Sequence, residues 1–413
     1  MILRSFVFVT SILFSLAFLP GCRSESSDPL SSSSVSDTSS AEKTSRPVSK
    51  KTSSFADSGA AWPFARGNAR GTGFLPQRFA PPLKIDWEFE LEDDAFTNSP
   101  VIAGSTVFVA STEGELIALS LDKGKEQWRY SAKNVFLASP SFRNGRIYIG
   151  DRKGWVHCVN AANGQAIWGF PSNQIIDKAV NFDGDRVLFT NEDGLLYCLD
   201  AKNGKEIWRY QSKAEDKNEQ PLECFPTVVG RFVLLGGCNG YLIVIDLDTG
   251  KEVRSIELDD STGSAAANDG KLAFLGTVGK TVWAIDYTTG RVAWEYHADK
   301  HAAEYRSSAA VTPTRIFVGS RDRRLHAINR VTGKAVWVFP TQGWIDGSPT
   351  VLDDVVYFGS DDGRFYAVDA KTGKELWNIE LGGTVLGSPA FANDRLVVAT
   401  DDGRVICFVR SKD

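Results

Sequence analysis

The sequence predicts an all-β protein, an eight-bladed β-propeller closed by pairing of its N- and C-terminal strands. Three observations predict this fold: a unit that recurs about every 40 residues, four short strands in each unit, and two incomplete units at the chain ends. The clearest mark of the unit is a tryptophan, which is replaced once by arginine. These positions are Trp87, Trp128, Trp168, Trp208, Arg254, Trp294, Trp337 and Trp377.

The seventh unit shows the predicted strands most clearly. Its runs of β-branched and aromatic residues are bounded by short polar turns and lie at Ser348–Leu352, Val355–Ser360, Arg364–Asp369 and Lys374–Leu381. The third run, RFYAVD, is mostly apolar, as it is in other units, so these strands must be covered on both faces. A small sheet meets that condition when it lies between two neighbouring sheets, as a propeller blade does.

The turn before the tryptophan has a structural explanation. In DAKTGK, Asp369 is expected to accept backbone N–H bonds across the turn, and Gly373 to adopt the positive φ that a side chain resists. Trp377 then enters the outermost strand, where its ring can pack between adjacent blades. The repeated aspartates and glycines are therefore predicted to build the fold rather than an active site.

The two ends of the repeat region supply one blade between them. Ser388–Val409 carries the signals for the first three strands of a unit, and Lys84–Glu90 carries the signature of a fourth. Pairing these segments gives eight blades over residues 84–410 and removes the open sheet edges. A seven-bladed ring is the alternative count.

The N-terminus has the features of an export signal followed by a tether. Residues 1–21 contain an apolar run, Phe6–Leu19, which is shorter than a membrane-spanning helix. The run leads into LPGC, which resembles the bacterial lipobox, so Cys22 is expected to be lipidated; ordinary signal cleavage is the alternative. Residues 22–58 are rich in serine and poor in bulky apolar side chains, which predicts a disordered tether.

The expected location is the cell envelope, with the body of the protein facing the periplasm. Arg23, rather than an aspartate, follows Cys22, and this favours the outer membrane over the inner membrane as the site of the lipid anchor. The ring is expected to be a monomer. The formal net charge of −5 argues against nucleic acid as a partner, because phosphate binding needs a basic surface.

The repeat resembles a known family. The pattern G-x-x-Y/H-A/C-L/V/I-D/N-x-x-T/N-G-K/R-x-x-W, seen in GRFYAVDAKTGKELW, is similar to the PQQ-like (quinoprotein) repeat and covers residues 60–409. Eight such repeats behind a lipobox are similar to the BamB type of outer-membrane assembly lipoprotein. The resemblance implies a non-enzymatic scaffold that binds envelope proteins, the β-barrel assembly machinery among them. It also marks residues 59–83, which include WPFARGNARGTGF, as a clasp lying against the propeller.

Two other functions are compatible with this repeat. A quinoprotein oxidoreductase would bind pyrroloquinoline quinone and calcium, and the resemblance implies for it two adjacent cysteines, which this sequence lacks. The acidic pairs Asp361-Asp362 and Asp401-Asp402 stand where a β-turn favours aspartate, so they do not by themselves indicate calcium. No cofactor or metal is therefore expected. A propeller that binds polysaccharide or another envelope ligand is the second alternative.

The histidines do not form a predicted metal site. His157 and His326 occupy the third-strand position of Tyr366 and are expected to be core residues. His297 and His301 lie four residues apart in one connection, but a third strong ligand is missing from the sequence nearby.

The cysteines fall into two groups. Cys158, Cys198 and Cys407 lie on third strands and are expected to be small core residues. Cys224 and Cys238 flank a hairpin and are expected to form a disulfide, with two free buried thiols as the alternative.

The connections between blades vary while the strands repeat. Those that vary most all open on one face of the predicted ring and are Glu88–Phe96, Gln211–Glu223, Glu257–Gly263, Glu295–Arg306 and Pro340–Asp346. A rigid ring with variable loops on one face is suited to protein recognition. Trp344, Asp346, His297 and His301 are the candidate contact residues; the alternative for Trp344 is that it packs at the entry to the next blade.

Overall fold

The computed structural model describes residues 61–211, 224–237, 239–298 and 302–411. They belong to one compact unit, Ala56–Asp413, and every regular element in the described part is a β-strand. No helix in this part has the length and apolar character needed to cross a membrane. The predicted signal peptide (1–21), Cys22 and the tether (22–58) lie outside the described residues.

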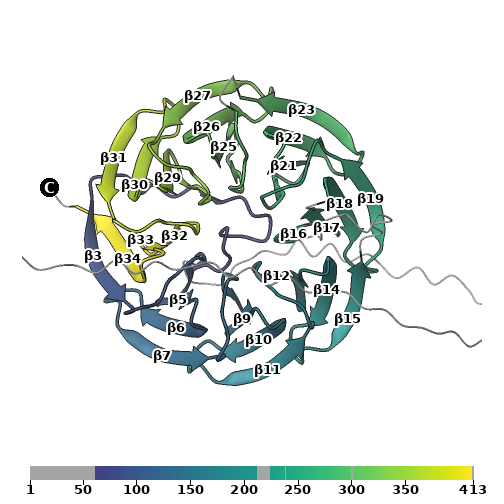
Figure 1. Ribbon diagram of the computed structural model, residues 1–413, viewed down its shortest axis with the longest axis vertical. Helices are drawn as coiled ribbons and strands as arrows, with labels where there is room; N and C mark the ends of the chain where they lie inside the picture. Colours follow the sequence, from purple (N-terminus) through teal and green to yellow (C-terminus); the bar gives the residue numbers. More distant parts are fainter. Residues whose placement is uncertain (1–60, 212–223, 238, 299–301, 412–413) are drawn as a thin grey trace, which may run out of the picture. The chain divides into compact units, whose positions relative to one another are not determined.

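Eight small sheets stand around one central axis and form a closed ring (Figure 1), which confirms the predicted eight-bladed propeller and excludes the seven-bladed alternative. In blades 1 to 7 the four antiparallel strands follow chain order from the centre outward.

The strands of the first four blades are as follows. Blade 1 contains β4 (Val101–Ala103), β5 (Thr106–Ala110), β6 (Glu115–Ser120) and β7 (Glu126–Ser131). Blade 2 contains β8 (Ser141–Arg143), β9 (Arg146–Gly150), β10 (Trp155–Asn160) and β11 (Ala166–Pro171). Blade 3 contains β12 (Asn181–Asp183), β13 (Arg186–Thr190), β14 (Leu195–Asp200) and β15 (Glu206–Gln211). Blade 4 contains β16 (Thr227–Val229), β17 (Phe232–Gly236), β18 (Tyr241–Asp246) and β19 (Glu252–Glu257).

The remaining blades continue the ring. Blade 5 contains β20 (Ala267–Asn268), β21 (Leu272–Gly276), β22 (Thr281–Asp286) and β23 (Arg291–His297). Blade 6 contains β24 (Ala310–Val311), β25 (Arg315–Ser320), β26 (Arg324–Asn329) and β27 (Ala335–Pro340). Blade 7 contains β28 (Thr350–Leu352), β29 (Val355–Ser360), β30 (Arg364–Asp369) and β31 (Glu375–Glu380). Blade 8 contains β32 (Ala390–Ala392), β33 (Arg395–Ala399), β34 (Arg404–Arg410) and β3 (Leu83–Glu90).

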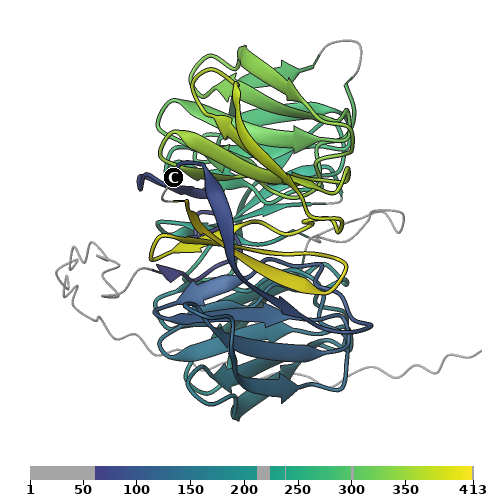
Figure 2. The same ribbon diagram turned by 90° about the vertical axis from the view of Figure 1, so that its left-hand side faces the viewer.

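Blade 8 closes the ring with strands from both ends of the repeat region. Its outermost strand, β3, pairs antiparallel with β34 from Leu83 opposite Arg410 to Glu90 opposite Arg404. Figure 2 shows this dark strand lying along the yellow β34. The pairing confirms that the two incomplete units complement each other, and it covers the edge of β34 that would otherwise be unpaired.

The hydrophobic core lies between the blades. The third strands are buried at nearly every position, as β30 is from Phe365 to Val368, whereas the outermost strands, such as β31, consist mostly of exposed and half-buried residues. In one of these layers, Val156 and Cys158 of blade 2 pack with Phe182 and Leu199 of blade 3. The mostly apolar third strands predicted from the sequence are therefore explained by cover from two neighbouring sheets.

The repeated tryptophans connect each blade to the next. In six cases the indole Nε1–H donates to a backbone carbonyl of the following blade at 2.9–3.2 Å, from Trp87 to Leu121, Trp128 to Ala161, Trp168 to Ala201, Trp208 to Leu247, Trp294 to Arg330 and Trp337 to Ala370. The turn glycine of that blade lies under the ring: a Cβ built on Gly373 would be 2.7 Å from Trp337. The glycine thus provides both the positive φ, +73° at Gly373, and the space for the indole.

Residues 61–75 run through the centre of the ring. β1 (Ala61–Trp62) pairs with β4 of blade 1, and β2 (Phe74–Leu75) pairs in parallel with β28 of blade 7. Between them, backbone carbonyls accept hydrogen bonds from the innermost strands of blades 2 to 6; these bonds join Pro63 to Phe142, Ala69 to Asn181 and Val228, Arg70 to Asn268, and Thr72 to Val311. This dark segment crosses the middle of Figure 1. The segment, here called the plug, fills the channel where the sequence suggested a clasp against the propeller.

Blade 4 uses arginine in the tryptophan position, which leads to a stability prediction. Arg254 covers Gly290 and donates from Nη2 to Thr288 O at 3.1 Å, but its buried Nε has no hydrogen-bond partner among the described residues. We expect Arg254→Trp to raise the free energy of unfolding by about 1–2 kcal/mol, because an indole buries more apolar surface and its Nε1–H can reach the carbonyl of Tyr287. Urea unfolding measures the change. A urea midpoint of Arg254→Trp below that of the wild type would contradict this explanation of the tryptophan position.

Candidate functional site

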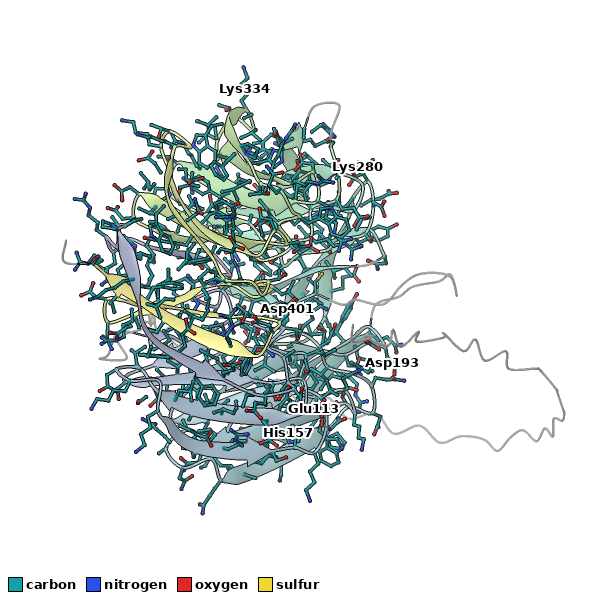
Figure 3. The ribbon with its side chains drawn as sticks, turned by 60° about the vertical axis from the view of Figure 1, so that its left-hand side comes forward. Glu113, His157, Asp193, Lys280, Lys334 and Asp401 are labelled. Atoms are coloured by element: carbon teal, nitrogen blue, oxygen red, sulfur yellow. The ribbon has the colours of Figure 1, made fainter. Side chains whose placement is uncertain are left out.

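The variable connections and the turns between second and third strands lie on one side of the ring, here called the connection face. Backbone bonds hold the two sets together: the N–H of Thr112 donates to Ala95 O, that of Arg321 to Glu304 O, and that of Asp361 to Trp344 O. Figure 3 labels four of the turn residues, Glu113, Asp193, Lys280 and Asp401, on this side. The loops are therefore attached to the rigid blades at regular points.

The most structured set of exposed side chains lies where blade 6 meets blade 7. The Arg321 guanidinium stacks on the Trp344 indole, with 4.6 Å between its Cζ and the ring centroid. Asp346 accepts from the same guanidinium, with Nη2–Oδ2 at 2.7 Å and Nε–Oδ1 at 3.1 Å. This contact raises the pKa of Arg321 above its ordinary value, so the guanidinium is fully charged. We call Arg321, Trp344 and Asp346 the blade 6–7 cluster.

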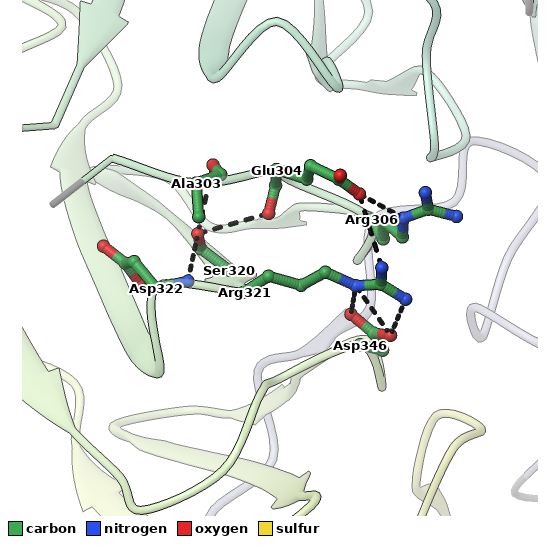
Figure 4. Close-up of polar contacts among 7 residues, drawn as sticks. All are labelled: Ala303, Glu304, Arg306, Ser320, Arg321, Asp322 and Asp346. Atoms are coloured by element: carbon green, nitrogen blue, oxygen red, sulfur yellow. Dashed lines mark hydrogen bonds and ion pairs between the residues drawn. The ribbon is translucent and has the colours of Figure 1, made fainter.

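Neighbouring charges fix the cluster from the other side. Glu304 Oε2 lies 2.6 Å from Arg306 Nε and 3.4 Å from Arg321 Nη1, as the dashed lines in Figure 4 show. Partial burial, followed by the charge of Asp346, raises the pKa of the nearby Asp361 carboxyl. The alternating charges hold Arg321 in one orientation, and Asp361 adds a negative charge that a basic side chain would relieve.

The backbone of Trp344 is fixed by a hydrogen bond, whereas its indole ring is partly exposed to solvent. Its side chain is 44% exposed, whereas the following Ile345 is fully buried and donates its N–H to Ser320 O at 3.2 Å. The residue that fills the blade entry is thus Ile345, and the indole beside it faces solvent on one side. An aromatic ring positioned in this way needs little reordering to contact another molecule.

The structure brings together two of the four predicted contact residues. Trp344 and Asp346 meet through Arg321, which sequence reasoning missed; a signal was available, because blade 6 has SRDRR (320–324) where blade 7 has SDDGR (360–364). His297 lies on blade 5, 3.4 Å from Glu295 and 3.3 Å from Thr281, in a separate set of contacts. His301 lies outside the described residues, as does Cys238. Cys224 is buried with Sγ 3.2 Å from Thr262 Oγ1, and its disulfide stays a prediction.

The third-strand histidines have a polar role in addition to their burial. His326 lies between Tyr296 Oη at 3.0 Å and Asp322 Oδ2 at 3.0 Å, and His157 makes the equivalent contacts with Tyr130 and Asp151. In blade 7 the same place is taken by Tyr366, whose hydroxyl donates to Asp362 Oδ2 at 2.8 Å. The turn aspartates thus anchor the aromatic position of the third strand.

These bonds bear on the calcium–quinone alternative. Asp362 is engaged by Tyr366, Asp402 by Arg404, and Asp401 by the backbone N–H of Thr384 at 2.7 Å. Among the described residues, no three His, Cys, Asp or Glu side chains are grouped as metal ligands. Calcium takes six to eight oxygen ligands. The turn aspartates and the other residues that the structure describes therefore do not fit a calcium-bound quinone.

Comparison with known proteins defines the family. The model described as "Outer membrane protein assembly factor BamB" matches residues 84–153, 152–235, 215–340 and 300–406, which together span nearly the whole propeller. The chain belongs to this PQQ-like repeat family. No curated protein matches the chain by sequence.

Solved structures with the same fold have several functions. BamB from Moraxella catarrhalis is 19% identical, with a TM-score of 0.68 over 81% of this chain and 99% of that one. The quinohemoprotein alcohol dehydrogenase ADHIIG from Pseudomonas putida HK5 is 14% identical, with a TM-score of 0.72 over 84% and 80% of the two chains. A computationally designed protein, Ika8, is 18% identical, with a TM-score of 0.69 over 79% and 99%. At these identities the likeness concerns the fold, and function must be argued from the site.

Proposed function

We propose that the chain is a non-enzymatic envelope lipoprotein that binds partner proteins through the connection face and thereby assists outer-membrane protein assembly. The observation that carries this proposal is the blade 6–7 cluster, in which a half-exposed Trp344 is stacked by Arg321 and Asp346 fixes the guanidinium. The chain belongs to the family whose model is described as an outer membrane protein assembly factor, and this supports a role in outer-membrane protein assembly. The β-barrel assembly machinery is the expected partner.

The chemistry of the cluster suits a protein partner. Tryptophan and arginine are the residues most often found to dominate the free energy of binding at protein interfaces. Here both are oriented before binding, so less side-chain entropy is lost when a partner covers them. Asp361, with its raised pKa, favours a basic side chain at the edge of the contact.

A capture experiment tests the proposal with a matched control. Full-length chain isolated from cells by a C-terminal tag should retain envelope partners, and Trp344→Ala should reduce that retention about tenfold or more, because a central tryptophan contributes about 2 kcal/mol or more to binding. Trp155→Ala is the control, since Trp155 on β10 of blade 2 is 43% exposed, close to the 44% of Trp344. Equal loss from both variants, or no loss from Trp344→Ala, would refute the assigned surface.

The proposed lipid anchor gives a separate prediction. If Cys22 carries the lipid, Cys22→Ala should move the protein from the membrane pellet to the soluble fraction of broken cells. A variant with Cys158→Ala should stay in the pellet, because Cys158 is buried in the propeller core. Immunoblotting of the two fractions decides, and an unchanged distribution of Cys22→Ala would count against the anchor.

A further inference from the structure

The connection face has a depression on the axis of the ring, apart from the blade 6–7 cluster. Its volume is about 210 Å³, and its wall is formed where each connection ends, just before the innermost strand of the next blade. One position recurs there in every blade and is occupied by Ser99, Ser139, Ala179, Phe225, Ala265, Ser308, Ser348 and Ser388. Five of these eight residues are serine, which gives the depression a polar wall.

The five serines form a collar of hydroxyl groups. Backbone N–H groups of neighbouring blades donate to four of them, from Ser388 to Ser99 Oγ at 2.8 Å, Ser99 to Ser139 Oγ at 2.9 Å, Ala265 to Ser308 Oγ at 3.1 Å and Ser308 to Ser348 Oγ at 2.9 Å. Within the described residues, none of the five hydroxyls donates a hydrogen bond to the protein. Each hydroxyl group can accept and donate at once, so five O–H donors are left for a ligand.

The plug contributes a buried cation to the same depression. Arg66 is 4% exposed, and its Nη atoms donate to Pro349 O, Ser388 Oγ, Ser308 O and Ala309 O. Its Nε has no hydrogen-bond partner, and no ion pair of the described residues includes it. Burial lowers the pKa of Arg66 to about 9. The guanidinium therefore carries a charge that no carboxylate of the described protein neutralises.

The other ionic groups of the wall balance each other. Asp177 and Lys178 form an ion pair, which leaves the single charge of Arg66 as the net charge of the lining. One buried positive charge surrounded by O–H donors is complementary to one negative charge with several acceptor positions. A carboxylate fits this description, whereas a dianion would leave a buried negative charge in excess.

We propose that the depression binds the carboxylate of a small organic acid or of an acidic side chain, with its charge balancing that of Arg66 and its oxygens bound by the serine collar. The volume is below the roughly 300–1,000 Å³ of sites for drug-sized ligands, so only a small group can enter.

This inference does not depend on partner binding at the blade 6–7 cluster. It requires only the plug and the inner ends of the connections. Trp344→Ala should therefore leave carboxylate binding unchanged. Failure of partner binding and failure of carboxylate binding can thus be told apart.

Isothermal titration calorimetry of the full chain tests the proposal. Lactate should bind with a Kd of roughly 1 mM, as expected for six non-hydrogen atoms, and neutral lactamide at least tenfold more weakly. Arg66→Met, checked for folding by circular dichroism, should lose lactate binding by the same factor. N-acetyl-aspartate amide, compared with N-acetyl-asparagine amide, tests whether a side-chain carboxylate enters as well as a free acid.

Because Arg66 also holds the plug, a wild-type measurement accompanies the variant. A crystal soaked in lactate should show a carboxylate in the depression beside Arg66, within hydrogen-bond distance of collar hydroxyls. A carboxylate in that place, whether from lactate or from N-acetyl-aspartate amide, supports the proposal. Equal binding of lactate and lactamide, tighter binding of sulfate than of lactate, or a soaked crystal without a carboxylate there would overturn it.

Discussion

Replacing Gly373 by alanine is expected to lower the free energy of unfolding by about 3 kcal/mol. The residue has φ +73°, where an L side chain costs about 1–2 kcal/mol, and the new Cβ would lie 2.7 Å from the Trp337 ring. The indole cannot retreat without losing its bond to Ala370 O at 3.2 Å, so the overlap adds about 1–2 kcal/mol. Urea unfolding followed by tryptophan fluorescence measures the total.

A second glycine separates the backbone effect from the indole contact. Gly104, in the turn between β4 and β5, has φ +60°, and no heavy atom would lie within 4 Å of an added Cβ. Gly104→Ala should therefore cost only the backbone preference, about 1 kcal/mol. If the two variants lose equal stability, Gly373 is needed for its turn alone. The contact between this glycine and the Trp337 ring then does not contribute to the loss.

Removing Trp87 is expected to weaken the closure of the ring by about 3–5 kcal/mol. Trp87 lies on β3, the strand that completes blade 8, and donates to Leu121 O of blade 1 at 2.9 Å with only 8% of its surface exposed. Trp87→Ala removes that bond, leaves a cavity beside Gly124, and loosens the packing of β3, the strand that closes the ring, against blade 1. Differential scanning calorimetry should show a lower unfolding temperature.

Trp377 is the matched control for this variant. It holds the same place in blade 7, but the outer strand of blade 8 comes from the N-terminal side, so no turn glycine lies beneath it. Its indole instead packs on Phe408, with ring centroids 5.7 Å apart, and is half-buried. Trp377→Ala should cost about half as much as Trp87→Ala. A larger loss at Trp377 would contradict the assigned role of the turn contact.

The ring could be predicted from the sequence because its rules are local and repeated. The period, the alternating turns and the apolar third strands each follow from strand pairing and burial, and the complementary ends identify the split blade. The sequence also indicates the glycine beneath six of the tryptophans, since it follows each of these tryptophans at a similar distance. The 40-residue period gives the number of blades, whereas this relation joins two different blades.

The two candidate sites were harder to predict because they depend on contacts between distant parts of the chain. Arg321 comes from a turn in blade 6 and Trp344 from the next connection, and their stacking depends on the side-chain orientation set by Asp346. Arg66 and Ser388 are 322 residues apart in the sequence. They meet inside a channel that forms only when the eight blades close into a ring. The WPFARG motif suggested a clasp; its burial within the ring had no local signal.

Partner binding is expected where the repeats differ from one another, and site-specific photo-cross-linking in cells tests this most directly. A photo-reactive amino acid at position 344 should give a defined cross-linked band with an envelope protein, identified by mass spectrometry as a component of the β-barrel assembly machinery. The same amino acid at position 155, equally exposed on blade 2, should give none. A cross-linked band from position 155 with none from position 344 would contradict the proposed binding surface.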